Sequence, residues 1–273
     1  IEKGFDVTSL DNYSTGNIEN HFDGVKYLNE DIESISEIET QFDTCFHLAA
    51  QSRVQPSFDN PEESFRVNVN GTSKVMEWSK ENDVKVIYAG SSSKHHNPSD
   101  SPYAMYKFLG EEVCKLYRKS FGVNVEIARF YNVYGPGENI DEKYGNVFGI
   151  WRAKIAKGEP LPIVGDGKQK RDFIYIDDFV DSCIEVMNKV DEYTIYNVGS
   201  GKGTTVNEIL HHCQTIENHL VVVEIVFTIS WRTFRLGLLN TANKVNVVPT
   251  VSKMSTVQQM LPLLQCVLSL KLC

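Results

Sequence analysis

The sequence lacks the features that would place the protein outside the cytosol. Its 273 residues contain no run of eighteen apolar residues and no signal-peptide pattern, so no membrane-spanning helix is expected. The six cysteines are scattered without a C-x-x-C pair, which is typical of reduced thiols and not of a disulfide framework or a zinc site. We therefore expect a cytoplasmic protein with no metal centre and no membrane partner.

An excess of basic charge, internal repeats and low-complexity tracts are also absent. The formal net charge is −9 at pH 7, which argues against a nucleic-acid partner. A hydrophobic content of 41% and a charged content of 23% are ordinary for a soluble globular protein. The length suits one large domain or two small ones.

Acidic residues are scarce in the last part of the chain. Residues 214–273 hold only Glu217 and Glu224 as acids, beside five basic residues, and contain no Asp. The segment is therefore poor in residues that cap helices and form turns. We hypothesise that a reading-frame shift or gene junction produced this atypical tail. Resequencing the locus in an independent isolate tests this, and an uninterrupted frame encoding the same tail would contradict it.

Apolar strand-like runs alternate with helical patterns before that tail. Strands are predicted at 4–10, 25–28, 42–50, 84–89, 124–130 and 173–176, and helices at 62–82, 103–120, 146–157 and 177–190. Thr205 and Glu208 have the spacing of a capping box. The alternation predicts an α/β fold, a Rossmann-type doubly wound parallel sheet with right-handed crossovers, whose ligands bind at the carboxyl ends of the strands.

Tyr103 and Lys107 stand four residues apart at the start of a predicted helix. At this spacing both side chains lie on one helical face. A phenol has a pKa of about 10, and a nearby ammonium favours the phenolate, so the pair suits proton transfer to or from a hydroxyl. Ser91 follows the predicted strand 84–89 and is positioned to assist. Alone the pattern is equally typical of a surface helix with a solvated Lys, and of a flexible serine turn.

Asp11 ends the first predicted strand. An acid at the end of the second strand of a dinucleotide fold accepts hydrogen bonds from ribose hydroxyls, and a helix cap or turn is the alternative interpretation. A Gly-x-Gly-x-x-Gly turn is expected about 20 residues before such an acid. Asp11 stands too near the start of the chain for that turn. We therefore expect the first strand and the glycine loop to be missing, the dinucleotide to be bound weakly, and the chain to have little activity.

Ten short motifs occur in the order typical of one enzyme family. They are Asp11-Asn-x-Ser-x-Gly16, Asp31-Ile32, His47-Leu-Ala-Ala50, Asn68-Val-Asn-Gly-Thr72, Ser91-Ser-Ser93, Tyr103-x-x-x-Lys107, Arg129-Phe-Tyr-Asn-Val-Tyr-Gly-Pro136, Gly165-Asp-Gly167, Arg171-Asp-Phe-Ile-Tyr-Ile-Asp-Asp178 and Tyr196-Asn-Val-Gly199. On these motifs, residues 4–210 resemble an extended short-chain dehydrogenase/reductase of the NAD-dependent epimerase/dehydratase family.

The resemblance implies NAD as cofactor, a nucleotide sugar as substrate, and a role for each matching residue. Tyr103 is the general base and acid on the sugar 4-hydroxyl. Lys107 holds the nicotinamide ribose and lowers the pKa of Tyr103. Ser91, with Ser92 or Ser93 as the alternative, hydrogen-bonds the same hydroxyl. Cofactor contacts are expected from Tyr103 as well as from Lys107, and further ones from Asp11, Asn12, Ser14, Asp31, Ile32, Leu48, Ala49, Ala50, Asn68 and Tyr131. Substrate contacts are expected from Arg53, Ser92, Asn132, Asn146, Val147 and Arg171.

The residues after Ser91 depart from the family pattern. Dehydratases and decarboxylases of this family follow the catalytic serine with an acid, and this chain has Ser-Ser-Lys instead. The departure favours 4-epimerisation of a UDP-hexose through a transient 4-keto intermediate. The alternatives are a nucleotide-sugar 4,6-dehydratase, decarboxylase or 4-ketoreductase, or an inert Rossmann-like binding protein. His95 and His96 are interpreted as loop residues, because no other metal ligand stands nearby.

The resemblance also implies a division of the chain and an oligomeric state. Residues 1–130 are predicted to form an incomplete NAD-binding domain. Residues 131–213 are predicted to form a smaller, interleaved α/β domain for the nucleotide sugar, followed by the tail 214–273. A homodimer is expected through the helices predicted at 62–82 and 103–120, which would form a four-helix contact.

Overall fold

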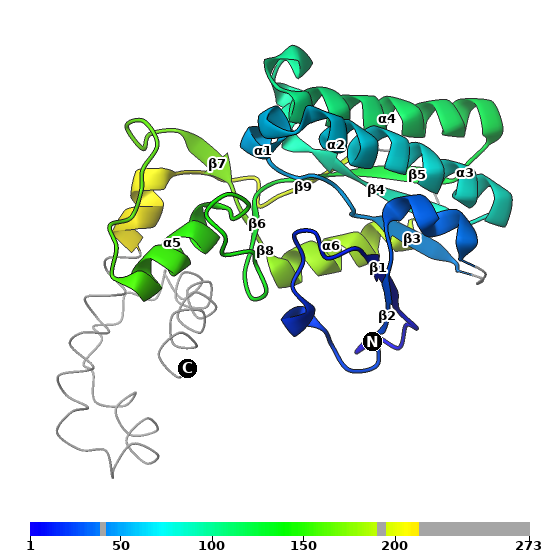
Figure 1. Ribbon diagram of the computed structural model, residues 1–273, viewed down its shortest axis with the longest axis horizontal. Coiled ribbons are helices and arrows are strands. Elements are labelled where there is room, and N and C mark those ends of the chain that lie inside the picture. Colours follow the sequence, from blue (N-terminus) through cyan, green and yellow to red (C-terminus); the bar gives the residue numbers. More distant parts are fainter. Residues whose placement is uncertain (39–41, 190–194, 213–273) are drawn as a thin grey trace, which may run out of the picture. The chain divides into compact units, whose positions relative to one another are not determined.

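The structure is a computed structural model that describes residues 1–38, 42–189 and 195–212 (Figure 1). Contacts divide the chain into two compact units. Of the described residues, the first comprises those within Ile1–Leu161 and Asp172–Lys202, and the second comprises Pro162–Arg171 and residues 203–212. The predicted tail, 214–273, lies outside the described residues. The division of the chain at residue 130 stays a prediction.

The first unit contains a parallel sheet. Its order is β3 (Thr44–His47), β4 (Lys85–Ser91), β5 (Val125–Phe130) and β9 (Ile195–Val198). Two further parallel pairs join β1 (Thr8–Asp11) to β2 (Lys26–Asn29), and β6 (Val133–Tyr134) to β8 (Ile174–Tyr175). Parallel pairing brings the carboxyl ends of β3, β4 and β5 to one edge. The predicted Rossmann-type α/β fold is therefore confirmed.

Helices connect the strands of the first unit. In chain order they are α1 (Val54–Asp59), α2 (Pro61–Phe65), α3 (Thr72–Asn82), α4 (Pro102–Phe121), α5 (Val147–Lys157) and α6 (Ile176–Asn188). Among the described residues none of these helices has the length and apolar content needed to cross a bilayer. The predicted helices 103–120, 146–157 and 177–190 correspond to α4, α5 and α6.

The helix predicted at 62–82 is interrupted. A π-helical turn, Arg66–Gly71, separates α2 from α3. The hydroxyl of Thr72 donates to the carbonyl of Asn68 at 2.9 Å, which supports the widened turn. A Cβ on Gly71 would lie 2.9 Å from Ile32, so the turn approaches the segment after β2 closely. These contacts depend on residues distant in sequence, which is why the helical pattern alone did not predict them.

Both faces of the sheet are covered, as the apolar strands predicted. Successive side chains of β4 point to opposite faces, so Val86 and Tyr88 pack under α3 and α4 while Ile87 packs toward α6 (Figure 1). The first core also holds Val75, Met76, Trp78, Cys114 and Ile127, and the second holds Ala128, Ile174, Val186 and Val198. The polar ends of the strands are the part of the sheet left for a ligand.

Helix α4 carries the predicted proton-transfer pair. Its N-cap is Ser101, whose hydroxyl accepts from the amide of Ala104 at 3.1 Å, and Gly122 ends it with a φ of 72°. A Cβ on Gly110 would lie 2.2 Å from the hydroxyl of Tyr88. The glycine therefore lets α4 pack tightly on β4, which places the start of α4 beside the end of that strand.

Strand β7 (Lys170–Asp172) pairs with β10 (Gly203–Thr205), and Lys170, Arg171 and β10 belong to the second unit. The capping box predicted after it is present. The carboxylate of Glu208 accepts from the amide of Thr205 at 2.7 Å, and the amide of Glu208 donates to the Thr205 hydroxyl at 3.1 Å.

Candidate active site

A serine and a tyrosine meet where β4 ends. Ser91 Oγ lies 3.2 Å from Tyr103 Oη, and the amide of Ser93 donates to the same Oγ at 3.1 Å. Because the Ser91 oxygen already accepts a hydrogen bond, its own proton is available to the phenol or to a ligand oxygen. The structure thus brings together two of the three predicted catalytic residues, and it places Ser91 rather than Ser92 against Tyr103.

The backbone of Tyr103 is held by a helix from earlier in the chain. Its amide donates to the hydroxyl of Ser57 at 3.0 Å, and that hydroxyl donates to the carbonyl of Val54 at 2.6 Å. Ser57 is 1% exposed. Helix α1 therefore anchors the first turn of α4, which limits how far the phenol moves from Ser91.

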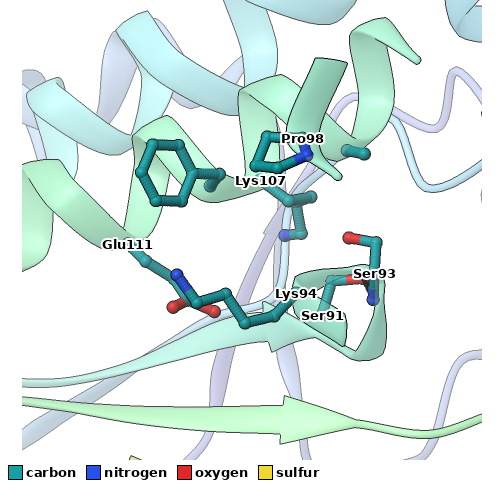
Figure 2. Close-up of a pocket in the computed structure, with 8 residues that line it drawn as sticks. Ser91, Ser93, Lys94, Pro98, Lys107 and Glu111 are labelled. Carbon is teal, nitrogen blue, oxygen red and sulfur yellow. Dashed lines mark hydrogen bonds between the residues drawn. The ribbon is translucent and has the colours of Figure 1, made fainter. Parts of the chain in front are cut away.

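Lys107 is a buried cation on α4. Its side chain points from α4 toward the turn after β4 (Figure 2), and Nζ lies 4.9 Å from the ring centroid of Tyr88. The residue is 6% exposed, and within the described ranges Nζ has no hydrogen-bond acceptor. Burial lowers the pKa of Lys107 to about 8, although Cys114 and Glu111 oppose the shift. Such an ammonium can donate hydrogen bonds to the hydroxyls of a ligand, which agrees with its predicted role in binding the ribose of NAD.

The pKa of Tyr103 moves in the direction opposite to the prediction. Burial raises it, while the hydrogen bond from Ser91 and the charge of Arg53 act against that rise. Lys107 is not among the groups that lower it, and its ammonium lies 4.9 Å from the centroid of the Tyr88 ring. The prediction that Lys107 lowers the pKa of Tyr103 is therefore not met in this structure.

Arg53 is the cation that acts on the phenol. It precedes α1, and its Nε donates to the carbonyl of Tyr144 at 2.6 Å. Its charge lowers the pKa of Tyr103, and burial lowers the pKa of Arg53 itself. The sequence predicted Arg53 only as a substrate contact; its influence on Tyr103 depends on the packing of α1 against α4.

Glu111 is a site residue that the sequence interpretation missed. It is 1% exposed, lines the same small pocket as Ser91 and Lys107, and raises the pKa of Lys107 (Figure 2). Its carboxylate accepts from Arg129 through Nε at 3.0 Å and Nη2 at 2.7 Å. The four-residue spacing from Lys107 on one helical face was the available sequence indication.

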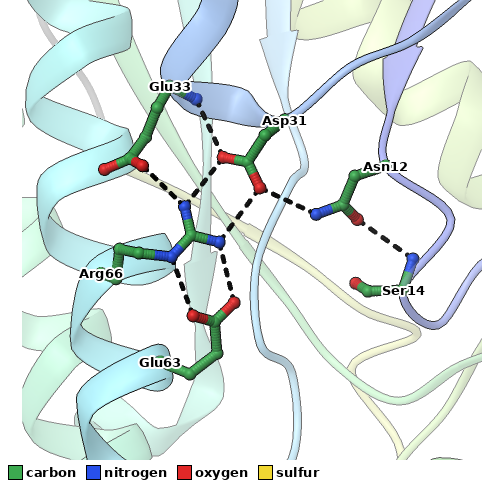
Figure 3. A network of polar contacts seen from close by, with 6 residues as sticks. All are labelled: Asn12, Ser14, Asp31, Glu33, Glu63 and Arg66. Atoms are coloured by element: carbon green, nitrogen blue, oxygen red, sulfur yellow. Dashed lines mark hydrogen bonds and ion pairs between the residues drawn. The ribbon is translucent and has the colours of Figure 1, made fainter.

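The predicted adenosine contacts lie on the loops after β1 and β2. Asp11 accepts from the amide of Tyr13 at 2.7 Å and is exposed. Asn12 donates to Asp31 at 2.9 Å and accepts from the amide of Ser14 at 3.0 Å (Figure 3). Ile32, next to Asp31, is 8% exposed and packs in the core. The structure therefore connects Asn12, Ser14 and Asp31 directly.

The predicted cofactor residues after β3 are exposed or partly buried. Leu48 is 48% exposed, and Ala49 and Ala50 are partly buried. Asn68 is buried, and its side chain bonds both backbone groups of Gln51, at 2.9 Å and 3.0 Å. Asn68 thus holds the loop in place by contacts within the protein.

His95 contacts a predicted cofactor residue. Its Nε2 lies 2.8 Å from the hydroxyl of Tyr131, the residue that follows β5. The sequence interpretation treated His95 as a loop residue without a role, and nothing in its local pattern indicated this partner. Within the described residues no cluster of three His, Cys, Asp or Glu side chains is arranged to hold a metal.

Several predicted substrate residues are engaged within the protein. Asn132 donates to the carbonyl of Asp172 at 2.7 Å. Asn146 caps α5 by accepting from the amides of Phe148 and Gly149, and it donates to Val133 at 2.9 Å. Val147 begins α5, and Ser92 begins a short 3-10 turn, Ser92–His95. Arg171 belongs to the second unit, where its Nη1 donates to the carbonyl of Lys170 at 3.1 Å. Substrate contacts from these residues stay predictions.

The fold and the site together define a class of protein. A parallel sheet with a serine–tyrosine pair at the carboxyl end of a strand, and a buried lysine one turn along the next helix, is the arrangement of a dinucleotide-dependent enzyme of the short-chain dehydrogenase/reductase type. The buried Lys107 ammonium, which has no hydrogen-bond acceptor among the described residues, fits such a cofactor together with the small Ala49 and Ala50 after β3.

Comparison with known proteins identifies the family. Residues 1–199 match the NAD dependent epimerase/dehydratase family. A protein of Methanocaldococcus jannaschii, provisionally named a UDP-glucose 4-epimerase, is 34% identical over 227 residues, which cover 77% of this chain and 73% of the relative. The chain belongs to this NAD-dependent family, and its cofactor is NAD.

Solved structures are similar as well. The UDP-glucose 4-epimerase of Thermotoga maritima, crystallised with UDP-glucose, has a TM-score of 0.70 and 29% identity, over 76% of this chain and 73% of its own. An enzyme of Bordetella bronchiseptica, crystallised with NAD+, has a TM-score of 0.67 and 30% identity, over 74% of this chain and 67% of its own.

The buried charge of Lys107 makes stability depend on pH. Its pKa falls from 10.5 to about 8 on folding, so the unfolded chain binds more protons between these values and stability rises with pH across that window. Relative to Lys107→Met, the wild type is expected to gain about 3 kcal/mol from pH 8 to pH 10.5. Urea unfolding of both proteins measures this, with Lys119→Met, on an exposed position of α4, as control. A difference that does not vary with pH would contradict it.

Proposed function

We propose that this protein is an NAD-dependent nucleotide-sugar 4-epimerase that acts on a UDP-hexose. The observation that carries the proposal is the 3.2 Å contact between Ser91 and Tyr103 at the end of β4, one helical turn from the buried Lys107. The names of the similar proteins, a UDP-glucose 4-epimerase among them, support the choice of substrate.

Each residue of the proposed site has its own part in the proton transfer. Tyr103 takes the proton of the sugar 4-hydroxyl and returns it to the same oxygen after the sugar has turned its opposite face toward the cofactor. Ser91 holds the same oxygen, and Arg53 lowers the pKa of Tyr103 against the effect of burial. Lys107 binds the ribose next to the nicotinamide. When bound, NAD supplies the acceptor and donor of the C4 hydride.

The surroundings of the pair favour epimerisation over elimination or decarboxylation. Those reactions need a further acid or base at the ring, and Ser92, Ser93 and Lys94 follow Ser91. Of the residues that line the described pocket, Glu111 is the carboxylate, and it is occupied by Arg129. A 4-keto sugar would then be reduced again before another bond breaks.

Product analysis tests the proposal. The protein is incubated with NAD and with UDP-glucose, UDP-N-acetylglucosamine or GDP-mannose, and the sugars are identified by proton NMR. The expected result is conversion of a UDP-sugar to its 4-epimer without accumulation of a keto sugar. A keto product would favour the dehydratase alternative, and bound NAD without turnover of any sugar would favour an inert binding protein.

We also infer a homodimer through α3 and α4, with the segment before α3. Exposed apolar side chains on these elements support it: Phe65 is 38% exposed, and Leu116 and Phe121 are each 55% exposed. Multi-angle light scattering is expected to give twice the mass of one chain, and Leu116→Glu is expected to shift it to one. A monomeric wild type would contradict the inference.

A further inference from the structure

The ammonium of Lys107 lies over an aromatic ring of β4. Its Nζ is 4.9 Å from the centroid of the Tyr88 ring. Tyr88 is 2% exposed and Lys107 is 6% exposed, so the contact is shielded from water. A cation within about 6 Å of a ring centroid is attracted by the negative face of the ring, and the attraction is largest when the pair is desolvated. The face of Tyr88 therefore stabilises a charge that burial disfavours.

The ring of Tyr88 is held by neighbouring elements. Its hydroxyl approaches α4 so closely that a Cβ on Gly110 would lie 2.2 Å away. The ring of His47, at the end of β3, packs against it with the two centroids 5.5 Å apart and the planes at 60°. His47 is fixed in turn, because its Nε2 lies 2.9 Å from the hydroxyl of Thr72. These contacts keep the face of the ring under Lys107.

The titratable groups around Lys107 leave its hydrogen-bond donors unused. Glu111 of α4 lines the same pocket, and its carboxylate accepts two hydrogen bonds from Arg129 of β5. His47 of β3 stays neutral, because burial and the charge of Lys107 lower its pKa to about 3. Within the described residues the contact found for Lys107 Nζ is the Tyr88 ring. The remaining titratable groups are Tyr103 and Cys114 of α4, and Lys94 of the turn after β4.

A ring supports an ammonium differently from a carboxylate. A carboxylate would accept one or more of the three N–H groups of Lys107, whereas a ring face attracts the charge as a whole. We propose that Tyr88 is a positioning residue, whose ring holds the Lys107 ammonium in place and leaves its N–H groups for the ribose hydroxyls of the cofactor. Tyr88 acts through Lys107 and not by contact with a ligand. The inference rests on the proposed function for the use of the ammonium, but the ring contact is measured without any sugar.

Titration of Lys107 tests the contact. The side-chain signal of Lys107 is followed by NMR against pH in the full chain with isotope-labelled lysine, and Lys107→Arg assigns it. Tyr88 is replaced by Phe, then by difluorophenylalanine and pentafluorophenylalanine, which keep the shape of the ring and weaken its negative face stepwise. The pKa is expected at about 8 in the wild type and within about 0.3 units of that in Tyr88→Phe. With pentafluorophenylalanine it is expected about one unit lower, a tenfold loss of proton affinity.

NAD binding by the same proteins tests the positioning role. Because the competent form is the charged one, pentafluorophenylalanine in place of Tyr88 is expected to raise the dissociation constant of NAD about fivefold at pH 8 in calorimetry. At pH 6 the two proteins are both charged and are expected to agree within about twofold. This dependence on pH separates the role of the ring from a loss of packing, which would weaken binding at both pH values.

A second ring on the same helix provides the matched control. Phe108 lies under Lys94, with Nζ 4.6 Å from its centroid. Pentafluorophenylalanine in place of Phe108 is expected to leave the pKa of Lys107 within about 0.3 units of the wild type. An unchanged pKa with the fluorinated ring at Tyr88, or an equal shift in Tyr88→Phe, would overturn the proposal. So would NAD binding that does not follow the charge of Lys107, or a wild type that binds no NAD. Absence of sugar turnover would contradict only the proposed epimerase function.

Discussion

Replacing Tyr103 by Phe is expected to lower kcat for 4-epimerisation by about a thousandfold. The substitution removes only the hydroxyl that lies 3.2 Å from Ser91, and with it the group that exchanges the proton of the sugar hydroxyl. The ring and the amide that bonds Ser57 remain, so α4 keeps its anchor on α1. Initial rates with UDP-glucose measure the loss.

A neighbouring tyrosine provides the control. Tyr106 lies on the same helix, and its ring meets Phe65 edge-on at 5.3 Å, away from Ser91. Tyr106→Phe is expected to keep kcat within about twofold of the wild type, because its hydroxyl has no place in the proton transfer. NAD binding by Tyr103→Phe should match the wild type. If Tyr103→Phe retained a tenth or more of the activity, Tyr103 would not be the acid–base residue.

Breaking the pair between Arg129 and Glu111 is expected to cost about 3–5 kcal/mol of stability. Glu111 is 1% exposed, and the Arg129 side chain is 12% exposed, so Arg129→Met leaves a buried carboxylate without its cation. The pair joins α4 to β5 beneath the pocket, and Gly90 of β4 packs against both side chains. Urea unfolding monitored by circular dichroism measures the change.

Two further variants distinguish charge burial from lost packing. Arg129→Met combined with Glu111→Leu removes both charges and is expected to recover most of the loss, because no buried carboxylate is left unpaired. Lys115→Met breaks the partly exposed pair with Glu112 on the same helix and is expected to change stability by less than about 1 kcal/mol. Equal losses from Arg129→Met and Lys115→Met would contradict the assignment of a buried ion pair.

Local sequence patterns predicted most of the elements and the position of the central pair. Apolar runs such as 84–89 and 124–130 correspond to β4 and β5, and the helix predicted at 103–120 is α4. The spacing of Tyr103 and Lys107 placed both at the start of that helix. Such patterns are reliable because the periods of helix and strand depend on neighbouring residues.

Local sequence patterns did not predict which atoms the polar side chains bond. Asn146 was predicted to contact substrate, and its side chain caps α5. His95 was assigned no role, and it bonds Tyr131. Each of these contacts depends on which atoms the fold brings within about 3 Å, and that distance is not encoded in residue type or spacing.

The sequence by itself determined the α/β class and the family, because these depend on periodicity and on motifs in a fixed order, and the same motifs predicted the proton-transfer residues. Only the tertiary structure decided the charge environment. Burial raises the pKa of Tyr103, Arg53 opposes it, and Arg66 occupies the carboxylate of Asp31. The physical reason is that desolvation and ion pairing act over a few ångströms in space, between residues that are far apart along the chain.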